Sequence, residues 1–187
     1  MRRRIRVIKA AVFRCVLAGL AAAGIAGAAL AEVKASQPDA FQILFIERVS
    51  APPPAVYAAI GQVERWWSAE HTYSGDAMNL SLVMHPGGCF CERWKDGAVE
   101  HGRTIMLMRD QVVRLAAALG PLQNKAVTGV LTFLLKAEEG GTTLTAGYRV
   151  NASGASALDK DAVAVDGVLA IQVQRLKRYV ETGRAAP

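Results

Sequence analysis

The alternation of apolar and polar positions along the chain predicts a strand, a helix, a run of strands and a long terminal helix. An apolar run over residues 41–49 predicts the first strand, and the prolines at 52–54 suit the first turn of a helix that reaches residue 66. The clearest later strand is 142–150, where every second position from Leu144 onward is apolar. Five extended segments precede it, at residues 79–85, 88–94, 99–108, 112–118 and 126–137.

The last periodic segment predicts a helix over residues 159–182, with Asp159 as its N-cap. One face of this helix is expected to carry Val165, Val168, Leu169, Gln172, Leu176, Tyr179 and Val180. A meander of hairpins curves as it twists, and one long helix can cover its concave face. The pattern therefore predicts an α+β domain. The space between sheet and helix is either filled by side chains or left as a pocket.

The first 31 residues have the character of an export signal. A basic head is followed by an Ala- and Gly-rich apolar stretch over 15–29 and a small-residue exit. This order is typical of a secretory signal peptide cleaved after Ala31, which predicts a periplasmic or secreted protein. The alternative is a retained membrane anchor, for which the stretch is short and only weakly apolar. The expected division of the remaining chain is a flexible lead-in over 32–40, a domain over 41–183 and a tail over 184–187.

Export changes the meaning of the chain's net charge of +6. The leader holds six of the 22 Lys and Arg residues and none of the 16 acidic ones, so the mature chain carries 16 charges of each sign. No basic run is available to neutralise a phosphate backbone, which excludes nucleic-acid binding. No Gly-Lys phosphate loop is present, which excludes nucleotide-driven chemistry. We expect no membrane span after cleavage and no cofactor, and the oligomeric state is left open.

Two cysteines, Cys89 and Cys91, stay in the mature chain. Two positions apart on a regular strand, their β-carbons would lie about 7 Å apart, which is too far for a bridge. The sequence therefore predicts packed thiols rather than a disulfide, and no metal site.

The segment around Asp96-Gly97 is the most informative part of the chain. This dipeptide between two extended runs predicts a two-residue hairpin turn. Such a turn places Glu92 opposite His101, and Arg93 opposite Glu100 as a solvent-side ion pair. The face that carries Glu92 and His101 is expected to point inward, because it also carries Phe90, Trp94 and Val99.

A carboxylate and an imidazole opposed in an apolar setting bond to one another and shift each other's pKa. One interpretation is a structural polar pair that keeps two strands in register. A second is a polar anchor inside a ligand cavity. A third is catalysis, with His101 as base and Glu92 orienting it. The residues expected at the cavity rim are Trp66, Trp67, His71 and Tyr73.

A further set of short motifs is spread along the chain: Trp66-Trp67, residues 87–92, His101-Gly102, residues 119–122, Thr128-Gly129, residues 165–168, Gln172 and residues 175–177. Together these segments resemble the START-related SRPBCC superfamily, in the branch of polyketide cyclases and heat-shock-ATPase-activator homologues. The resemblance implies a helix-grip fold, in which a seven-stranded antiparallel sheet wraps around the C-terminal helix and leaves a deep hydrophobic cavity. By the same resemblance, the residues that line the ligand site are Trp66, Trp67, Phe90, Glu92, Trp94, His101, Leu119 and Leu122.

The fold alone does not assign an activity, because members of this superfamily bind varied ligands and some cyclise or dehydrate polyketides. The leading expectation is an exported binding domain that encloses a small hydrophobic molecule, such as a lipid or a polyketide-like compound. The first alternative is a cyclase- or dehydratase-like enzyme that uses His101 and Glu92. The second is a protein-interaction adaptor with a collapsed cavity.

Overall fold

The computed structural model describes residues 32–153 and 156–186. The predicted signal peptide and its cleavage site at Ala31 lie outside the described residues. Within the described part of the chain, no helix combines the length and apolar character that a membrane crossing requires.

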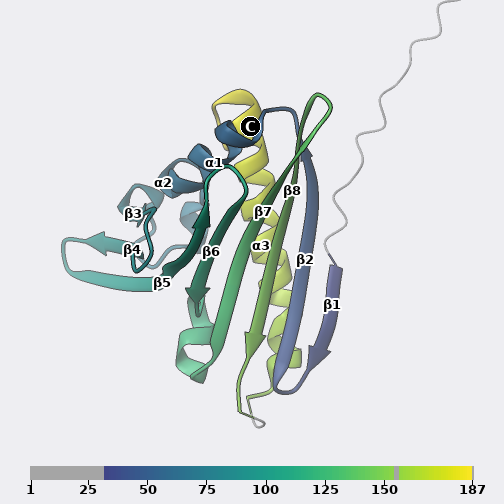
Figure 1. The fold of residues 1–187 in the computed structure, drawn as a ribbon. Helices are drawn as coiled ribbons and strands as arrows, with labels where there is room; N and C mark the ends of the chain where they lie inside the picture. Colours follow the sequence, from purple (N-terminus) through teal and green to yellow (C-terminus); the bar gives the residue numbers. More distant parts are fainter. Residues whose placement is uncertain (1–31, 154–155, 187) are drawn as a thin grey trace, which may run out of the picture.

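The fold is α+β, with one antiparallel sheet and a long C-terminal helix, as in a helix-grip fold (Figure 1). The sheet has eight strands in the order β1-β2-β8-β7-β6-β5-β4-β3. The strands are β1 Glu32–Gln37, β2 Ala40–Val49, β3 Leu80–Leu82, β4 Cys89–Trp94, β5 Gly97–Met108, β6 Val112–Ala117, β7 Thr128–Glu138 and β8 Gly141–Asn151. The helices are α1 Pro53–Gly61, α2 Val63–Trp66, α3 Leu158–Thr182 and the short 3₁₀ turns η1 Ala69–His71, η2 Ala77–Asn79 and η3 Gly120–Lys125.

The eighth strand, β1, corrects the expectation of seven strands and a flexible lead-in over residues 32–40. Gln37 pairs with Ala40, so the chain reverses through Pro38 and Asp39, and β1 then pairs along β2. This pairing occupies backbone groups of β2 that would otherwise lie on an open edge. Most side chains of β1 are exposed. A strand of this kind needs no apolar stripe, so its sequence lacks the pattern that would predict it.

The inner face of the sheet forms the core together with α3. Alternate residues of β2 and β8 are buried, as the period of a strand requires. On α3, three residues of the predicted face are buried: Leu169, Gln172 and Leu176. Figure 1 shows α3 running along one face of the sheet, with α1 and α2 at one end.

The helix boundaries differ from the predicted ones at two points. The first predicted helix is divided into α1 and α2 at Gln62, whose backbone leaves the helical conformation with φ −95° and ψ 51°. The predicted cap Asp159 lies inside the first turn of α3, because the capping position is Ala157. The chain reaches that position with the Leu158 N–H donating to the Pro38 carbonyl at 2.9 Å, so tertiary contact sets the start of the helix.

The β4–β5 hairpin forms, but its predicted register is wrong. Trp94 pairs with Gly97, so the turn consists of Lys95 and Asp96 rather than Asp96-Gly97. Gly97 does not adopt a positive φ. Its lack of a side chain serves a different purpose, because a Cβ there would overlap the Trp94 indole. In this register Glu92 pairs with Val99.

The expected ion pair between Arg93 and Glu100 is also absent from the hairpin. Arg93 faces Ala98, and the Glu100 carboxylate is bound by the Arg103 guanidinium at 2.5 Å instead. Both side chains of this pair are exposed, so its contribution to stability is under about 1 kcal/mol.

An irregularity in the same hairpin joins the two cysteines. The pairing shifts between Phe90 and Cys91, which leaves His101 as an extra residue in β5. The Cα atoms of Cys89 and Cys91 lie 5.4 Å apart and the two residues form a disulfide. A regular strand would hold these atoms about 6.6 Å apart, with the two side chains parallel on one face. The expectation of two free thiols was wrong because it assumed a regular strand.

Burial on α3 gives a direct test of this packing. Leu176 is fully buried (0% exposed), whereas Ile171 on the same helix is 44% exposed. We expect Leu176→Ala to lower the free energy of unfolding by about 2–5 kcal/mol, because a cavity would remain between α3 and the core. Ile171→Ala should change it by less than about 1 kcal/mol. Equal effects in chemical denaturation would contradict the packing described.

Candidate functional site

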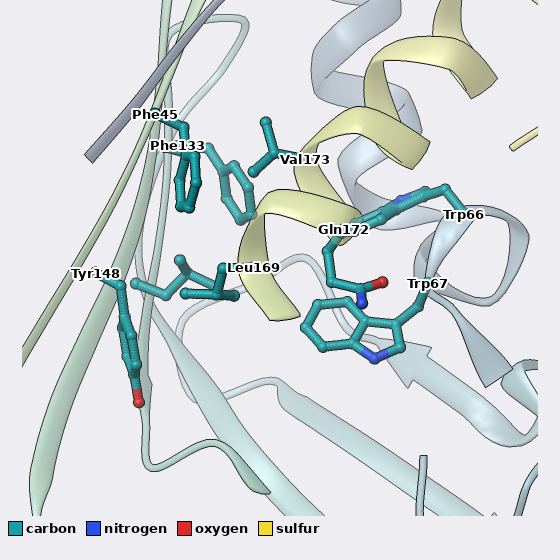
Figure 2. A pocket seen from close by; sticks show the side chains of 10 residues that line it. Phe45, Trp66, Trp67, Phe133, Tyr148, Leu169, Gln172 and Val173 are labelled. Carbon is teal, nitrogen blue, oxygen red and sulfur yellow. The ribbon is translucent and has the colours of Figure 1, made fainter. Parts of the chain in front are cut away.

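The space directly between α3 and the sheet is almost completely filled (Figure 2). Its remaining cavity measures about 10 Å³, roughly room for a single water molecule. The side chains around it are Phe45, Trp66, Trp67, Leu131, Phe133, Ala146, Tyr148, Leu169, Gln172 and Val173. The deep hydrophobic cavity implied by the resemblance is therefore occupied by the protein's own aromatic and aliphatic side chains.

A separate pocket of about 410 Å³ opens beside this filled space. It lies between the N-terminal half of α3, the segment after α2, strand β5 and the turn that leads into η3. The residues that line it are Trp67, His71, Thr72, Tyr73, His101, Leu119, Gly120, Pro121, Asn124, Ala164, Val165, Val168 and Leu169. We call this space the α3 pocket. Its walls are mainly apolar and its polar groups are few.

One wall of the α3 pocket belongs to a chain of aromatic contacts. The ring centroids lie 5.6 Å apart for Trp66 and Trp67, and 5.5 Å apart for Trp67 and Phe90. The His101 ring follows, with its centroid 5.0 Å from Phe90 and 5.9 Å from Tyr73. Tilted and edge-on arrangements of this kind add to the stabilisation from burial. The contacts fix the orientation of the imidazole.

His101 of this wall forms a buried hydrogen bond with Glu92, which lies behind it. His101 Nε2 lies 3.0 Å from Glu92 Oε2. His101 is 6% exposed and Glu92 is 0% exposed. The Glu92 carboxylate also accepts hydrogen bonds from the backbone N–H groups of Tyr73, at 3.1 Å, and Ser74, at 2.5 Å. The predicted contact between Glu92 and His101 is present despite the different register, because the extra residue in β5 turns the imidazole toward the carboxylate.

The surroundings set the charge of each partner. Burial by itself raises the pKa of the Glu92 carboxyl, but hydrogen bonds from Ser74, Tyr73 and His101 outweigh it and hold the pKa below its ordinary value of 4.5. Burial lowers the pKa of His101 below 6.5, and the hydrogen bond and charge of Glu92 offset this only in part. At neutral pH the pair is a carboxylate beside a neutral imidazole.

Gln172 of α3 positions the segment after α2 that lines the pocket. Its side chain is 1% exposed, and its Oε1 accepts the backbone N–H of Ser68 at 2.8 Å. Its amide nitrogen donates to His71 Nδ1 at 2.9 Å. Figure 2 shows the Gln172 amide beside the Trp67 indole. A single polar residue on an apolar helix face therefore fixes the segment that carries Trp67 and His71.

Tyr148 holds the turn at the mouth of the pocket. Its hydroxyl donates to the Ala117 carbonyl at 3.0 Å and accepts the Leu119 N–H at 3.2 Å. Burial raises the pKa of Tyr148 to about 12, so the phenol stays protonated and can donate. A Cβ at Gly129 would crowd both this hydroxyl and the Ala117 carbonyl, which explains the glycine.

The residues predicted to line a ligand site occupy three different environments. Three of them line the α3 pocket: Trp67, His101 and Leu119. Two lie directly behind His101: Phe90 and Glu92. The others are separate from the pocket: Trp66 in the filled space, Trp94 half-buried against Gly97, and Leu122 buried in η3.

Further pocket residues come from parts of the chain that sequence reasoning only partly identified. His71 and Tyr73, expected at a rim, line the pocket. Ala164 was not predicted, although its position one turn before Val168 on the helix face was a usable signal. Thr72 and Asn124 were not predicted either, and neither has a local pattern that could have identified it.

One group of potential metal-binding side chains occurs in the described residues. Cys89, Cys91 and Glu100 place their ligand atoms within 4.8 Å of one another. Metal ligation by cysteine requires thiolates, and both sulfurs are joined in the disulfide. The group as it stands is therefore no metal centre.

Comparison with solved structures shows the fold. CalU16 from Micromonospora echinospora is 15% identical with a TM-score of 0.58, over 86% of this chain and 88% of that chain. The Aha1 dimer from Colwellia psychrerythraea is 17% identical with a TM-score of 0.54, over 76% and 97%. DynU16, a protein of the dynemicin biosynthetic locus, is 19% identical with a TM-score of 0.56, over 77% of this chain and 48% of that one.

At these identities the likeness establishes the architecture alone. Neither a family model nor a curated protein matches the sequence. The neighbours agree with a helix-grip fold.

The Glu92–His101 pair predicts a loss of stability in acid. Both groups have a lower pKa in the folded protein than their ordinary values of 4.5 and 6.5. As the pH falls, the unfolded chain therefore binds each proton first, and the free energy of unfolding declines below pH 6.5 and again below pH 4.5. Chemical denaturation across this range measures both steps.

A pair of histidine variants isolates the first step. His101→Phe should remove the decline below pH 6.5. His85→Phe, at an exposed turn residue outside the pocket, should retain it. A profile that is the same for both variants would contradict the assignment to His101.

Proposed function

We propose that this protein is a binding protein that encloses a small hydrophobic molecule in the α3 pocket. The observation that carries the proposal is a mainly apolar space of about 410 Å³ with a buried carboxylate–imidazole pair on one wall. Pockets for small organic ligands commonly have this size and composition, with few polar groups to orient the guest. The leader sequence supports export, so the ligand would be met outside the cytoplasm.

The filled interior and the open pocket favour different functions. The filled space beneath α3 favours an adaptor with a collapsed cavity. The α3 pocket beside it favours ligand binding, because its aromatic wall is held by contacts that do not depend on a guest. A preformed wall lowers the entropy cost of binding.

Blocking the α3 pocket tests the proposal. Ala164 lines the pocket, while its neighbour Val163 is 74% exposed and lies outside it. We expect Ala164→Trp to weaken binding of the neutral fluorescent probe N-phenyl-1-naphthylamine by about tenfold or more, because the indole would occupy the ligand's space. The matched control Val163→Trp should bind as the unchanged protein does. Equal binding by both variants, or none by the unchanged protein, would overturn the proposal.

A second candidate is an enzyme of the cyclase or dehydratase type, and the orientation of His101 favours it. Glu92 holds Nε2, so the other ring nitrogen is available as a base. In dehydration of a β-hydroxy ketone, the α-proton would pass to Nδ1 and then to the departing hydroxyl, which leaves as water.

One substitution separates the two candidates. In an enzyme, His101→Ala should lower the turnover of a β-hydroxy ketone by about a hundredfold or more, because the base is lost. In a carrier it should weaken binding only modestly. Initial rates of water loss give the measurement, and a wild-type rate equal to that in buffer would remove the enzyme candidate.

A further inference from the structure

Among the polar groups of the α3 pocket, His101 and His71 have their hydrogen-bonding character fixed by residues behind them, one as an acceptor and one as a donor. From this arrangement we infer that its ligand is an uncharged apolar molecule with a hydroxyl-type donor for His101 and an acceptor for His71. We infer equally that carboxylates and other anions, fatty acids included, are rejected. The inference rests on the proposed binding function and names the class of ligand.

The acceptor is Nδ1 of His101. The Glu92 carboxylate already accepts two backbone N–H groups, from Tyr73 and Ser74, so it is the acceptor in its bond with the imidazole too. The proton of a neutral His101 therefore sits on Nε2, and Nδ1 carries the lone pair. A ligand at this position must bring a donor.

The donor is Nε2 of His71. The Ser68 N–H can only donate, so the Gln172 atom that it contacts is the amide oxygen. The other end of the same amide is then the nitrogen, which donates to Nδ1 of His71. The lone pair of His71 is used in that bond and its proton lies on Nε2. A ligand near His71 must bring an acceptor.

Both free nitrogens are open to a ligand. Within residues 32–153 and 156–186, no hydrogen bond engages Nδ1 of His101 or Nε2 of His71. In that part of the chain, neither nitrogen is a fully buried atom without a partner, so each keeps some exposed surface. Both rings line the α3 pocket. The two nitrogens therefore face space from which a guest can bond to them.

Charge excludes an acidic guest. No Lys or Arg occurs among the described residues that line the pocket. Lys125, next to the lining residue Asn124, is bound to Asp161 at 2.5 Å and to the Ser156 carbonyl at 3.3 Å. A carboxylate in the pocket would lose hydration without gaining a cation, and the buried charge of Glu92 would repel it.

Competition between three ligands of one skeleton tests the inference. N-phenyl-1-naphthylamine serves as the reporter, and 2-naphthol, 2-methoxynaphthalene and 2-naphthoate compete with it at pH 7.5. We expect 2-naphthol to displace the reporter at about one tenth of the concentration that 2-methoxynaphthalene needs, because methylation leaves the buried acceptor unpaired. The 2-naphthoate anion should compete most weakly.

Variants assign the discrimination to the histidine. His101→Phe keeps an aromatic wall and leaves Glu92 its two backbone donors, so the preference for 2-naphthol over 2-methoxynaphthalene should fall to about one. The matched control His85→Phe should keep the full preference. Retention of the preference in a folded His101→Phe protein would overturn the assignment.

The outcomes distinguish the inference from the function on which it rests. If the reporter binds but 2-naphthoate competes as well as 2-naphthol, the ligand class is wrong and the binding function stands. The same holds if 2-naphthol and 2-methoxynaphthalene compete equally in the unchanged protein, whatever the variants do. If the reporter does not bind at all, the proposed function is wrong, and the inferred ligand class is then wrong too.

Discussion

The buried carboxylate of Glu92 is the interaction on which the site depends. Two backbone donors from the segment Tyr73–Ser74 and the imidazole of His101 all converge on it. A carboxylate removed from water is tolerated only when its oxygens are satisfied, so these three segments must come together for the chain to fold. Glu92 therefore links β4, β5 and the segment after η1, and it also decides which nitrogen of His101 faces the pocket.

Gln172 performs the corresponding task for His71. It is buried on α3 and divides its amide between Ser68 and His71. The long helix thus does more than cover the sheet, because it fixes which nitrogen of His71 carries the proton. The aromatic rings around Trp67 fill the interior beneath α3. The open space is the α3 pocket beside it, which the histidines bonded to Glu92 and Gln172 line.

Several features could be predicted from the sequence because they depend on local pattern. The starting residues of the strand from Gly141 and of the helix from Leu158 were predicted to within about a turn. Periodic burial requires a periodic pattern of apolar residues, which can be seen in the sequence. The contact between Glu92 and His101 was also predicted. Its register was not, because the packing of Trp94 over Gly97 and the extra residue in β5 are contacts between strands.

What the chain determined by itself is the order of its elements from residue 40 onward and the inward face of the β4–β5 hairpin, because hydrophobic periodicity acts over a few residues. The meeting of Glu92 with His101 depends on the extra residue in β5, which is a feature of strand pairing. Only the tertiary structure decided that Cys89 and Cys91 are joined, that residues 32–37 form a strand, and that the space beneath α3 is filled. Each of these depends on how distant segments pack, and packing is settled by shape and volume rather than by local pattern.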